Sequence, residues 1–202
     1  ARLMRACQIA TPEPLAWAVQ SDSHAQRHYL LTAAIPWSET ADLYLARARA
    51  ADWSPDDLLE RAARLTLLAQ MLRRLHDQRF DHRDLKLQNI LCSQPGTSPG
   101  VWLLDLDGVR RWPWRSRARA VQNLSRLAVS ISFQKLATWT EQLRFLKTYL
   151  GETGSELPVQ SGVTAAISAD ASRPDWKWWW RAISRRAEQK IRQNARRGRP
   201  LS

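Results

Sequence analysis

The sequence is poor in cysteine and has no long apolar run. Its two cysteines, Cys7 and Cys92, lie far apart, and neither has a further cysteine or histidine at metal-ligand spacing. This pattern argues against a disulfide framework and against a zinc site, and we expect two ordinary buried thiols. Because no apolar run reaches about 18 residues, the sequence predicts no membrane-spanning helix.

The first residues also lack the basic, apolar and small-residue order of a secretion signal. We therefore expect the protein to act in the cytoplasm. The chain has 202 residues, of which 44% are hydrophobic. That is enough for one well-buried domain, or for one large lobe and part of a second.

Positive charge is concentrated in two segments. The formal net charge is +12, and the excess of lysine and arginine lies at 110–119 and from residue 173 to the end. The rest of the chain is close to neutral. This distribution indicates two local surfaces that attract anions, and it does not by itself indicate a nucleic-acid-binding protein.

Local patterns predict a β-hairpin followed by a long core helix. Residues 14–20 and 28–35 read as two strands joined by a polar turn. Ser54 as N-cap and Pro55 at the first helical position predict a helix of about five to six turns that ends at 76–77. Its core face is predicted from three- and four-residue steps to be Leu58, Ala62, Leu65, Leu68, Leu72 and Leu75.

Shorter elements follow the long helix. A short strand is predicted to begin at residue 89, then a turn rich in proline, glycine and serine at 93–100, and then an apolar strand at 101–107. Apolar residues at helical spacing predict two further helices up to residue 150 and a final helix from about residue 174. We find no internal repeat.

Residues 82–89 match the catalytic-loop pattern of protein kinases, H-R-D-L-x-x-x-N, at every defined position. In that pattern the aspartate, here Asp84, meets the acceptor hydroxyl, and Asn89 folds back to hold a metal ion beside the same phosphate. Asp105 ends the following apolar strand, where kinases carry the metal-binding aspartate of D-F-G. The alternative is a solvated loop and an aspartate that merely ends a strand. Two motifs in the right order favour a phosphoryl-transfer site.

Residues beside the two motifs have open roles. Lys86 either offsets charge that develops on the transferred phosphate or is simply solvated. Asp107 is either a second metal carboxylate or a polar structural residue, and we favour the structural role. His82 and Arg83 are expected to be structural.

Several segments together resemble the lipopolysaccharide kinase family of the Kdo/WaaP type, bacterial kinase-fold enzymes that phosphorylate sugars of the lipopolysaccharide inner core. These segments are RHYLLTAAIP, LRRLHDQRFDHRDLKLQNIL, LLDLDGVRR, NLSRLAVSI and FLKTYL. The resemblance runs from about Thr11 to Leu150. A typical protein kinase is disfavoured because Leu106-Asp107 replaces Phe-Gly and no Ala-Pro-Glu follows.

The resemblance implies an α+β, protein-kinase-like fold with a mostly α-helical large lobe and remnant β-strands of the small lobe. It implies ATP and Mg²⁺ as cofactors. By the same resemblance Asp84 is the catalytic aspartate, and Asn89 and Asp105 are the magnesium ligands. The backbone that contacts the adenine would be the hinge, formed by Ala33, Ala34 and Ile35.

The resemblance also suggests how the chain is divided. The first glycine is Gly96 and the first lysine is Lys86, whereas a kinase carries a Gly-rich loop and a strand lysine ahead of the hinge. We therefore expect a fragment that lacks the front of the small lobe and binds ATP weakly as given. The expected parts are the end of the small lobe and hinge (1–36), the large lobe (37–150), a linker-like stretch (151–172) and a basic, Trp-rich helix (173–202).

The predicted final helix is amphipathic, with tryptophans on one face and arginines on the other. The apolar positions are Trp176, Trp179, Trp180, Ile183, Ala187 and Ile191. One interpretation is peripheral contact with an anionic membrane, at the inner face of the bacterial inner membrane. The other is that the tryptophans cover the core and the arginines are solvated. Nucleic acid is disfavoured, because the cations form a continuous stripe without interleaved base-stacking aromatics.

The arginines that follow the second motif are candidates for anionic-substrate contacts. Arg110, Arg111 and Arg115 come directly after the expected metal aspartate, where an acceptor must approach. A solvated loop explains them equally well.

From the sequence we expect an ATP-dependent kinase that phosphorylates a hydroxyl of a lipopolysaccharide core sugar. A Ser/Thr-type protein kinase is the enzyme alternative, favoured by the catalytic loop. A pseudokinase or binding module is the non-enzyme alternative, favoured by the absence of the lysine and the Gly-rich loop.

Overall fold

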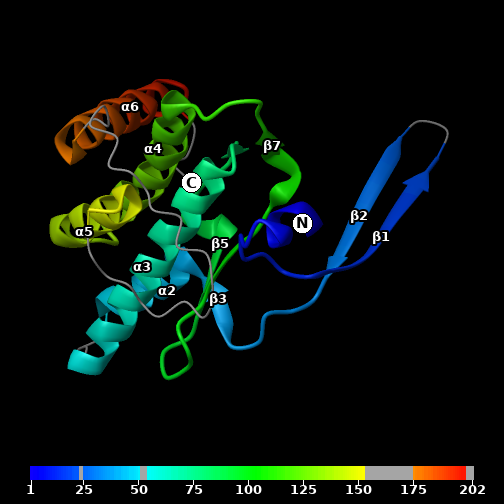
Figure 1. The fold of residues 1–202 in the computed structure, drawn as a ribbon, viewed down its shortest axis with the longest axis horizontal. Helices are drawn as coiled ribbons and strands as arrows, with labels where there is room; N and C mark the ends of the chain where they lie inside the picture. The colour runs from blue at the N-terminus through cyan, green and yellow to red at the C-terminus, as the bar shows by residue number, and fades with distance from the viewer. Residues whose placement is uncertain (23–24, 51–53, 153–174, 199–202) are drawn as a thin grey trace.

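The computed structural model describes residues 1–22, 25–50, 54–152 and 175–198 (Figure 1). The strands lie in the first half of the chain and between α3 and α4, and the described chain ends in three helices. The predicted mixture of a large helical lobe with a few strands is confirmed. The elements are α1 (Arg2–Ala6), β1 (Pro14–Ser21), β2 (Gln26–Thr32), β3 (Ser38–Thr40), α2 (Ala41–Ala50), α3 (Pro55–Asp77), β4 (Phe80–His82), η1 (Leu87–Asn89), β5 (Ile90–Ser93), β6 (Val101–Leu103), η2 (Leu106–Gly108), β7 (Val109–Arg111), α4 (Arg117–Gln134), α5 (Trp139–Leu150) and α6 (Trp176–Arg196).

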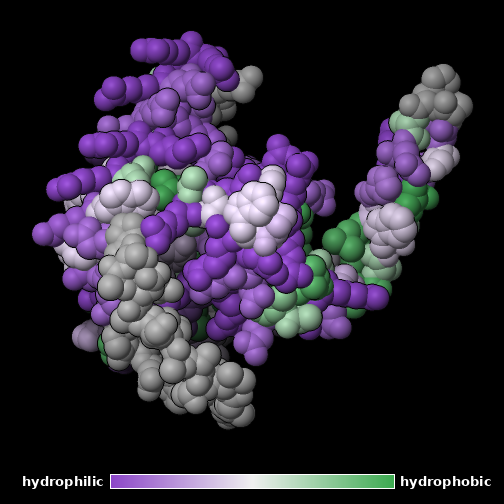
Figure 2. Space-filling view, turned by 45° about the horizontal axis from the view of Figure 1, so that its top comes forward, coloured by the Kyte–Doolittle hydropathy of each residue, from purple (hydrophilic) through white to green (hydrophobic). Residues whose placement is uncertain are grey.

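The predicted hairpin forms as β1 and β2, an antiparallel pair that projects from the body (Figure 1). Its second strand ends at Thr32, earlier than the predicted residue 35. One more bond follows the strand: Ala33, the first residue of the expected hinge, donates its N–H to the carbonyl of Glu13 (2.8 Å), next to the last strand pair of Pro14 and Thr32. Figure 2 shows hydrophobic side chains along this arm. The exposed ones include Leu15, Trp17, Tyr29, Leu30 and Leu31.

Helix α3 is the central helix of the large lobe, and it begins and ends as the sequence predicts. Ser54 and Asp57 form a capping box, each side chain accepting from the other's backbone N–H. Leu68, Leu72 and Leu75 are buried, as expected. The placement of Leu58 on the core face was wrong: it is 56% exposed, because the first turn of α3 lies beyond the part that packs against other elements.

Two small antiparallel sheets carry the loops between α3 and α4. Strands β3, β5 and β6 form one sheet, and β4 pairs with β7 in the other. The apolar strand predicted at 101–107 ends at Leu103. It stops there because Asp105 adopts a left-handed conformation (φ 49°, ψ 68°) that cannot continue a strand.

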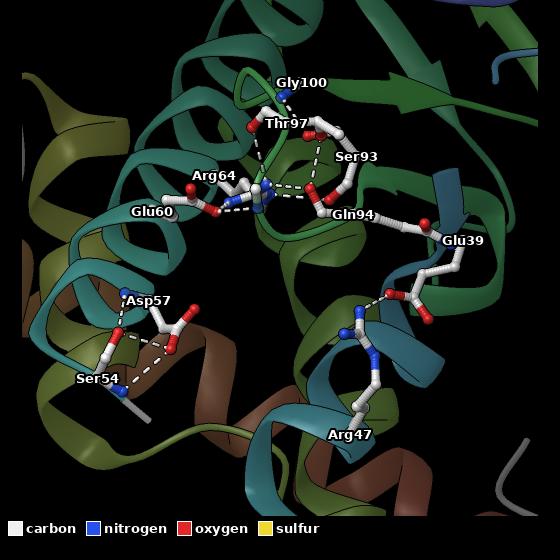
Figure 3. A network of polar contacts seen from close by, with 11 residues as sticks. Glu39, Arg47, Ser54, Asp57, Glu60, Arg64, Ser93, Gln94, Thr97 and Gly100 are labelled. Atoms are coloured by element: carbon white, nitrogen blue, oxygen red, sulfur yellow. Dashed lines mark hydrogen bonds and ion pairs between the residues drawn. The ribbon is translucent and has the colours of Figure 1, made fainter. Parts of the chain in front are cut away.

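A buried arginine ties the β5–β6 hairpin to α3 (Figure 3). The Arg64 guanidinium donates to the carbonyls of Ser93 (2.9 Å) and Gln94 (2.7 Å) and pairs with Glu60 (3.0 Å). Its side chain is 2% exposed. Because this hairpin joins η1 to η2, Arg64 fixes the segment between the two motif loops.

Helix α6 packs against α4 and α5 and belongs to the body of the lobe (Figure 1). Trp179 and Ala187 are buried, and the ring of Trp179 meets that of Tyr149 edge-on at 5.7 Å. Trp180 lies 5.1 Å from Trp139, between ring centroids. The tryptophan face therefore covers the core, as the second interpretation of this helix states, and the lysines and arginines of α6 are exposed.

Several further expectations concern single features. Cys92 is buried, and burial raises the pKa of its thiol to about 12, whereas Cys7 is only half-buried. Most of the linker-like stretch lies outside the described residues. No helix in the part of the chain that the structure describes is long and apolar enough to cross a membrane.

Candidate active site

The catalytic-loop motif lies between β4 and η1, and His82 anchors its start. His82 is fully buried, and its backbone N–H donates to Oδ1 of Asn123 on α4 (2.9 Å). Its ring Nε2 lies 3.0 Å from the carbonyl of Leu104, the residue before Asp105. The histidine thus ties the loop of Asp84 to the loop of Asp105, which is the structural role expected for it.

Asp84 is exposed and held by two neighbours from its own loop. Lys86 Nζ lies 3.0 Å from its Oδ2, and the amide of Asn89 donates to the same oxygen (3.3 Å) and to the Asp84 carbonyl (2.8 Å). Partial burial raises the pKa of Asp84, but the hydrogen bond and charge of Lys86, with the Asn89 bond, lower it below its ordinary value. Asp84 is therefore ionised at neutral pH.

Asp105 converges on the same point from the second loop. Its Oδ2 accepts from Nδ2 of Asn89 at 3.4 Å, so one amide bridges the carboxylates of Asp84 and Asp105. A backbone bond from the N–H of Leu104 to the carbonyl of Asn89 (2.8 Å) fixes the two loops side by side. A non-glycine residue in the left-handed region is uncommon and is concentrated at functional sites.

Gly108 allows the two loops to approach closely. A Cβ atom at this position would lie 3.2 Å from Cβ of Arg83, closer than an ordinary contact. Any larger residue would push η2 away from the catalytic loop. This gives the glycine of L-D-G a packing role that does not depend on its φ angle.

The residues present fit a magnesium ion held together with a nucleotide. Asn89 and Asp105 each carry a side-chain oxygen, and the two side chains lie next to each other, with Nδ2 of Asn89 3.4 Å from Oδ2 of Asp105. No group of three or more His, Cys, Asp or Glu side chains suited to a metal occurs among the described residues. Mg²⁺ is commonly held by one or two protein carboxylates together with substrate phosphates, rather than by an all-protein cage. The donor set matches that arrangement.

The arginines predicted to contact an anionic substrate have their contacts with residues outside the cluster of Asp84, Asn89 and Asp105. Arg111 lies over the ring of Phe80 (5.7 Å to the centroid), and Arg115 pairs with Asp77 at the end of α3. Arg110 is exposed on β7, opposite Asp81.

Asp107 and the expected hinge residues lie in the following positions. Asp107 is exposed in the first turn of η2. Ala34 and Ile35 follow β2, and the carbonyl of Ile35 accepts from the hydroxyl of Ser38 (2.7 Å).

Sequence reasoning missed the residues of α4 that support the catalytic loop. Asn123 and Ser130 are buried, and they bond the backbone N–H groups of His82 (2.9 Å) and Leu87 (3.3 Å). Asn123 also binds the buried Asp81, which pairs with Arg119. The available signal was a row of polar residues at three- and four-residue steps along the predicted helix, namely Arg119, Asn123, Arg126 and Ser130.

The main cavity of the body is separate from this site. It has a volume of about 560 Å³ and is lined mostly by apolar side chains of α2 to α6. Its lining residues, within the described chain, include Leu87 but none of Asp84, Asn89 and Asp105. Asp84 and Asp105 are instead exposed at the surface, and Asn89 is partly buried between them.

A helical lobe that presents an H-R-D-x-x-x-x-N loop against a second aspartate loop defines the protein-kinase-like class of phosphotransferases. A solved structure of WaaP in complex with acyl carrier protein supports this fold: it is 19% identical, with a TM-score of 0.65, and the match covers 93% of this chain and 72% of that one. The model of the lipopolysaccharide kinase (Kdo/WaaP) family matches residues 2–149. The chain belongs to that family. No curated protein matches it.

Proposed function

We propose that this protein transfers the γ-phosphoryl group of ATP to a hydroxyl of a lipopolysaccharide inner-core sugar. The observation that carries the proposal is the convergence of Asp84, Asn89 and Asp105, joined by one bridging amide. Family membership supports the class of acceptor.

Asp84 would orient the acceptor hydroxyl and take its proton as the oxygen attacks the γ-phosphorus and ADP leaves. An ionised carboxylate is required for this step, and the Lys86 and Asn89 contacts keep it ionised. Lys86 also places a cation within 3.0 Å of the carboxylate, where it can offset charge on the transferred group.

Asn89 and Asp105 would hold Mg²⁺. When bound, the ion neutralises charge on the phosphates. The protein's own part is to keep these two side chains at fixed positions relative to Asp84, through the backbone bond between Leu104 and Asn89. The backbone of Ala33 to Ile35 would contact the adenine.

The outward cations of α6 support peripheral contact with an anionic membrane surface, by charge rather than by insertion, because the tryptophan face is packed on the core. Co-sedimentation with anionic and with neutral vesicles tests this. Binding to anionic vesicles that disappears in high salt is expected, and equal binding to both would contradict it.

The decisive test of the catalytic proposal is transfer of radiolabel from ATP to lipopolysaccharide by the wild type and by Asp84→Asn, which keeps the shape but removes the base. Label on the lipid is expected with the wild type, and a loss of about 100-fold or more with the variant. Trp37→Gln, an exposed position 72% accessible, is a control. Label on polypeptides instead of lipid would indicate a protein kinase, and no use of ATP would indicate a binding module.

A further inference from the structure

The inner face of α4 places an arginine directly beside the catalytic loop. Asn123 and Ser130 on this face bond the N–H groups of His82 and Leu87, the two ends of the loop. Arg126 lies between them, three residues after Asn123, on the same side of the helix. Arg126 therefore faces the middle of the loop, where Asp84 lies.

Arg126 has a donor without a partner. Its Nη1 is buried and makes no hydrogen bond within the described part of the chain. Burial lowers the pKa of Arg126. The charges of Asp81 and Asp84 act to raise this pKa, and the charges of Arg186 and Arg83 lower it further. A buried guanidinium nitrogen left unbonded is costly, and a ligand that supplied an acceptor oxygen at this point would remove that cost.

Helix α6 adds two cations to the same place. It packs along α4 (Figure 1), and Arg186 and Lys190 lie one turn apart on it. Burial lowers the pKa of Lys190, the nearby Arg126 lowers it further, and Asp84 opposes this. Lys190 therefore lies within electrostatic range of both Arg126 and the catalytic aspartate.

The acids that face these cations are already engaged. Asp84 pairs with Lys86, and Asp81 binds Asn123 and Arg119. Positive charge beside Asp84 therefore exceeds negative charge. Figure 2 shows hydrophilic side chains over the end of the body formed by α4 and α6.

We propose that Arg126, Arg186 and Lys190 bind an anionic oxygen group of the acceptor, a carboxylate or a phosphate, next to the hydroxyl that Asp84 receives. The proposal rests on the proposed function and assigns its acceptor-binding residues. Arginine suits this role because its planar donors match the oxygens of either group. The site would select acceptors that carry a negative charge beside the reacting hydroxyl, and α6 would be part of it.

The test compares Arg126→Gln and Lys190→Gln with Arg181→Gln. Arg181 is an exposed residue of α6, about two and a half turns before Lys190 and on the opposite side of that helix, and its substitution removes the same charge. The KM for lipopolysaccharide in neutral detergent and the KM for ATP are measured for each protein. The first two substitutions are expected to raise the KM for lipopolysaccharide about tenfold each, with the KM for ATP unchanged, because each removes one charged contact.

A dephosphorylated acceptor distinguishes the two sources of the anion. If the difference between Lys190→Gln and wild type disappears with this acceptor, the bound group is a phosphate, and if it persists, a carboxylate. Equal KM values for Lys190→Gln, Arg126→Gln and Arg181→Gln would overturn the subsite while the transfer activity stands. No label on lipopolysaccharide with the wild type would overturn the proposed function itself, and the subsite with it.

Discussion

Replacement of Arg64 by methionine should destabilise the lobe more than any exposed charge change. The Arg64 guanidinium is nearly inaccessible, and it joins α3 to the hairpin between the two motif loops through the carbonyls of Ser93 and Gln94 (Figure 3). It also pairs with Glu60, one turn earlier on α3. Methionine has a comparable length and is apolar, so the substitution removes the donors without leaving a large cavity.

The size of the effect follows from what remains after the substitution. The carbonyls of Ser93 and Gln94 lose a charged donor, and Glu60, at 30% exposure, loses its partner. A hydrogen bond to a charged group contributes about 1.5–3 kcal/mol, and breaking a buried ion pair costs about 3–5 kcal/mol. Since Glu60 stays partly hydrated, we expect a loss of roughly 3 kcal/mol in the free energy of unfolding.

Chemical denaturation followed by tryptophan fluorescence measures this loss. Arg192→Met is the matched control, because Arg192 pairs with Glu188 at 3.8 Å and both side chains are more than half exposed. The control should change the free energy of unfolding by at most about 0.5 kcal/mol. A loss below about 1 kcal/mol for Arg64→Met would refute the reasoning, because the carbonyls would then have found other donors.

Three further predictions concern the site and its support. Gly108→Ala should push η2 away from Arg83 and so lower the rate of phosphoryl transfer at least about tenfold. The free energy of unfolding should fall by only about 1–3 kcal/mol. A variant with wild-type activity would contradict this. Lys86→Met should raise the pKa of Asp84, because Lys86 lowers it, and move the acid limb of kcat/KM to higher pH; an unmoved limb would assign that limb to another group. Burial lowers the pKa of His76 to about 4, so the unfolded chain, whose histidine titrates near 6.5, takes up the proton first as the pH falls. The free energy of unfolding should therefore drop by roughly 3 kcal/mol from pH 7.5 to 4, and His76→Gln should remove that part of the slope, as urea unfolding at several pH values would detect.

Elements with local signals were predictable from the sequence. The capping residues Ser54 and Pro55 define the start of α3, and the hairpin of β1 and β2 follows from alternation and a polar turn. The catalytic loop and Asp105 were predictable because their chemistry requires a set spacing. The structure brings Asp84, Asn89 and Asp105 together, as that spacing implies.

Features set by long-range packing were not predictable. Leu58 has the same spacing as Leu72, yet one is exposed and the other buried, because periodicity identifies a helix face without saying how far its neighbours extend. The left-handed conformation of Asp105 also has no local signal, since an aspartate before leucine favours no such turn by itself. The surrounding bonds to Asn89 and Leu104 impose it.

Helix α6 illustrates why positive charge alone does not identify a membrane-binding surface. Its tryptophans and arginines fit a membrane helix and a core-covering helix equally well, and the contacts of Trp179 and Trp180 with α5 favour the second for the tryptophan face. Helix α6 also packs along α4. That packing brings Lys190 toward Asp84. Helix α6 is thus packed on α4, the helix that carries Asn123 and Ser130. These two residues support the catalytic loop through the N–H groups of His82 and Leu87. Changes at the α4–α6 contact should therefore affect acceptor binding through position as well as through charge.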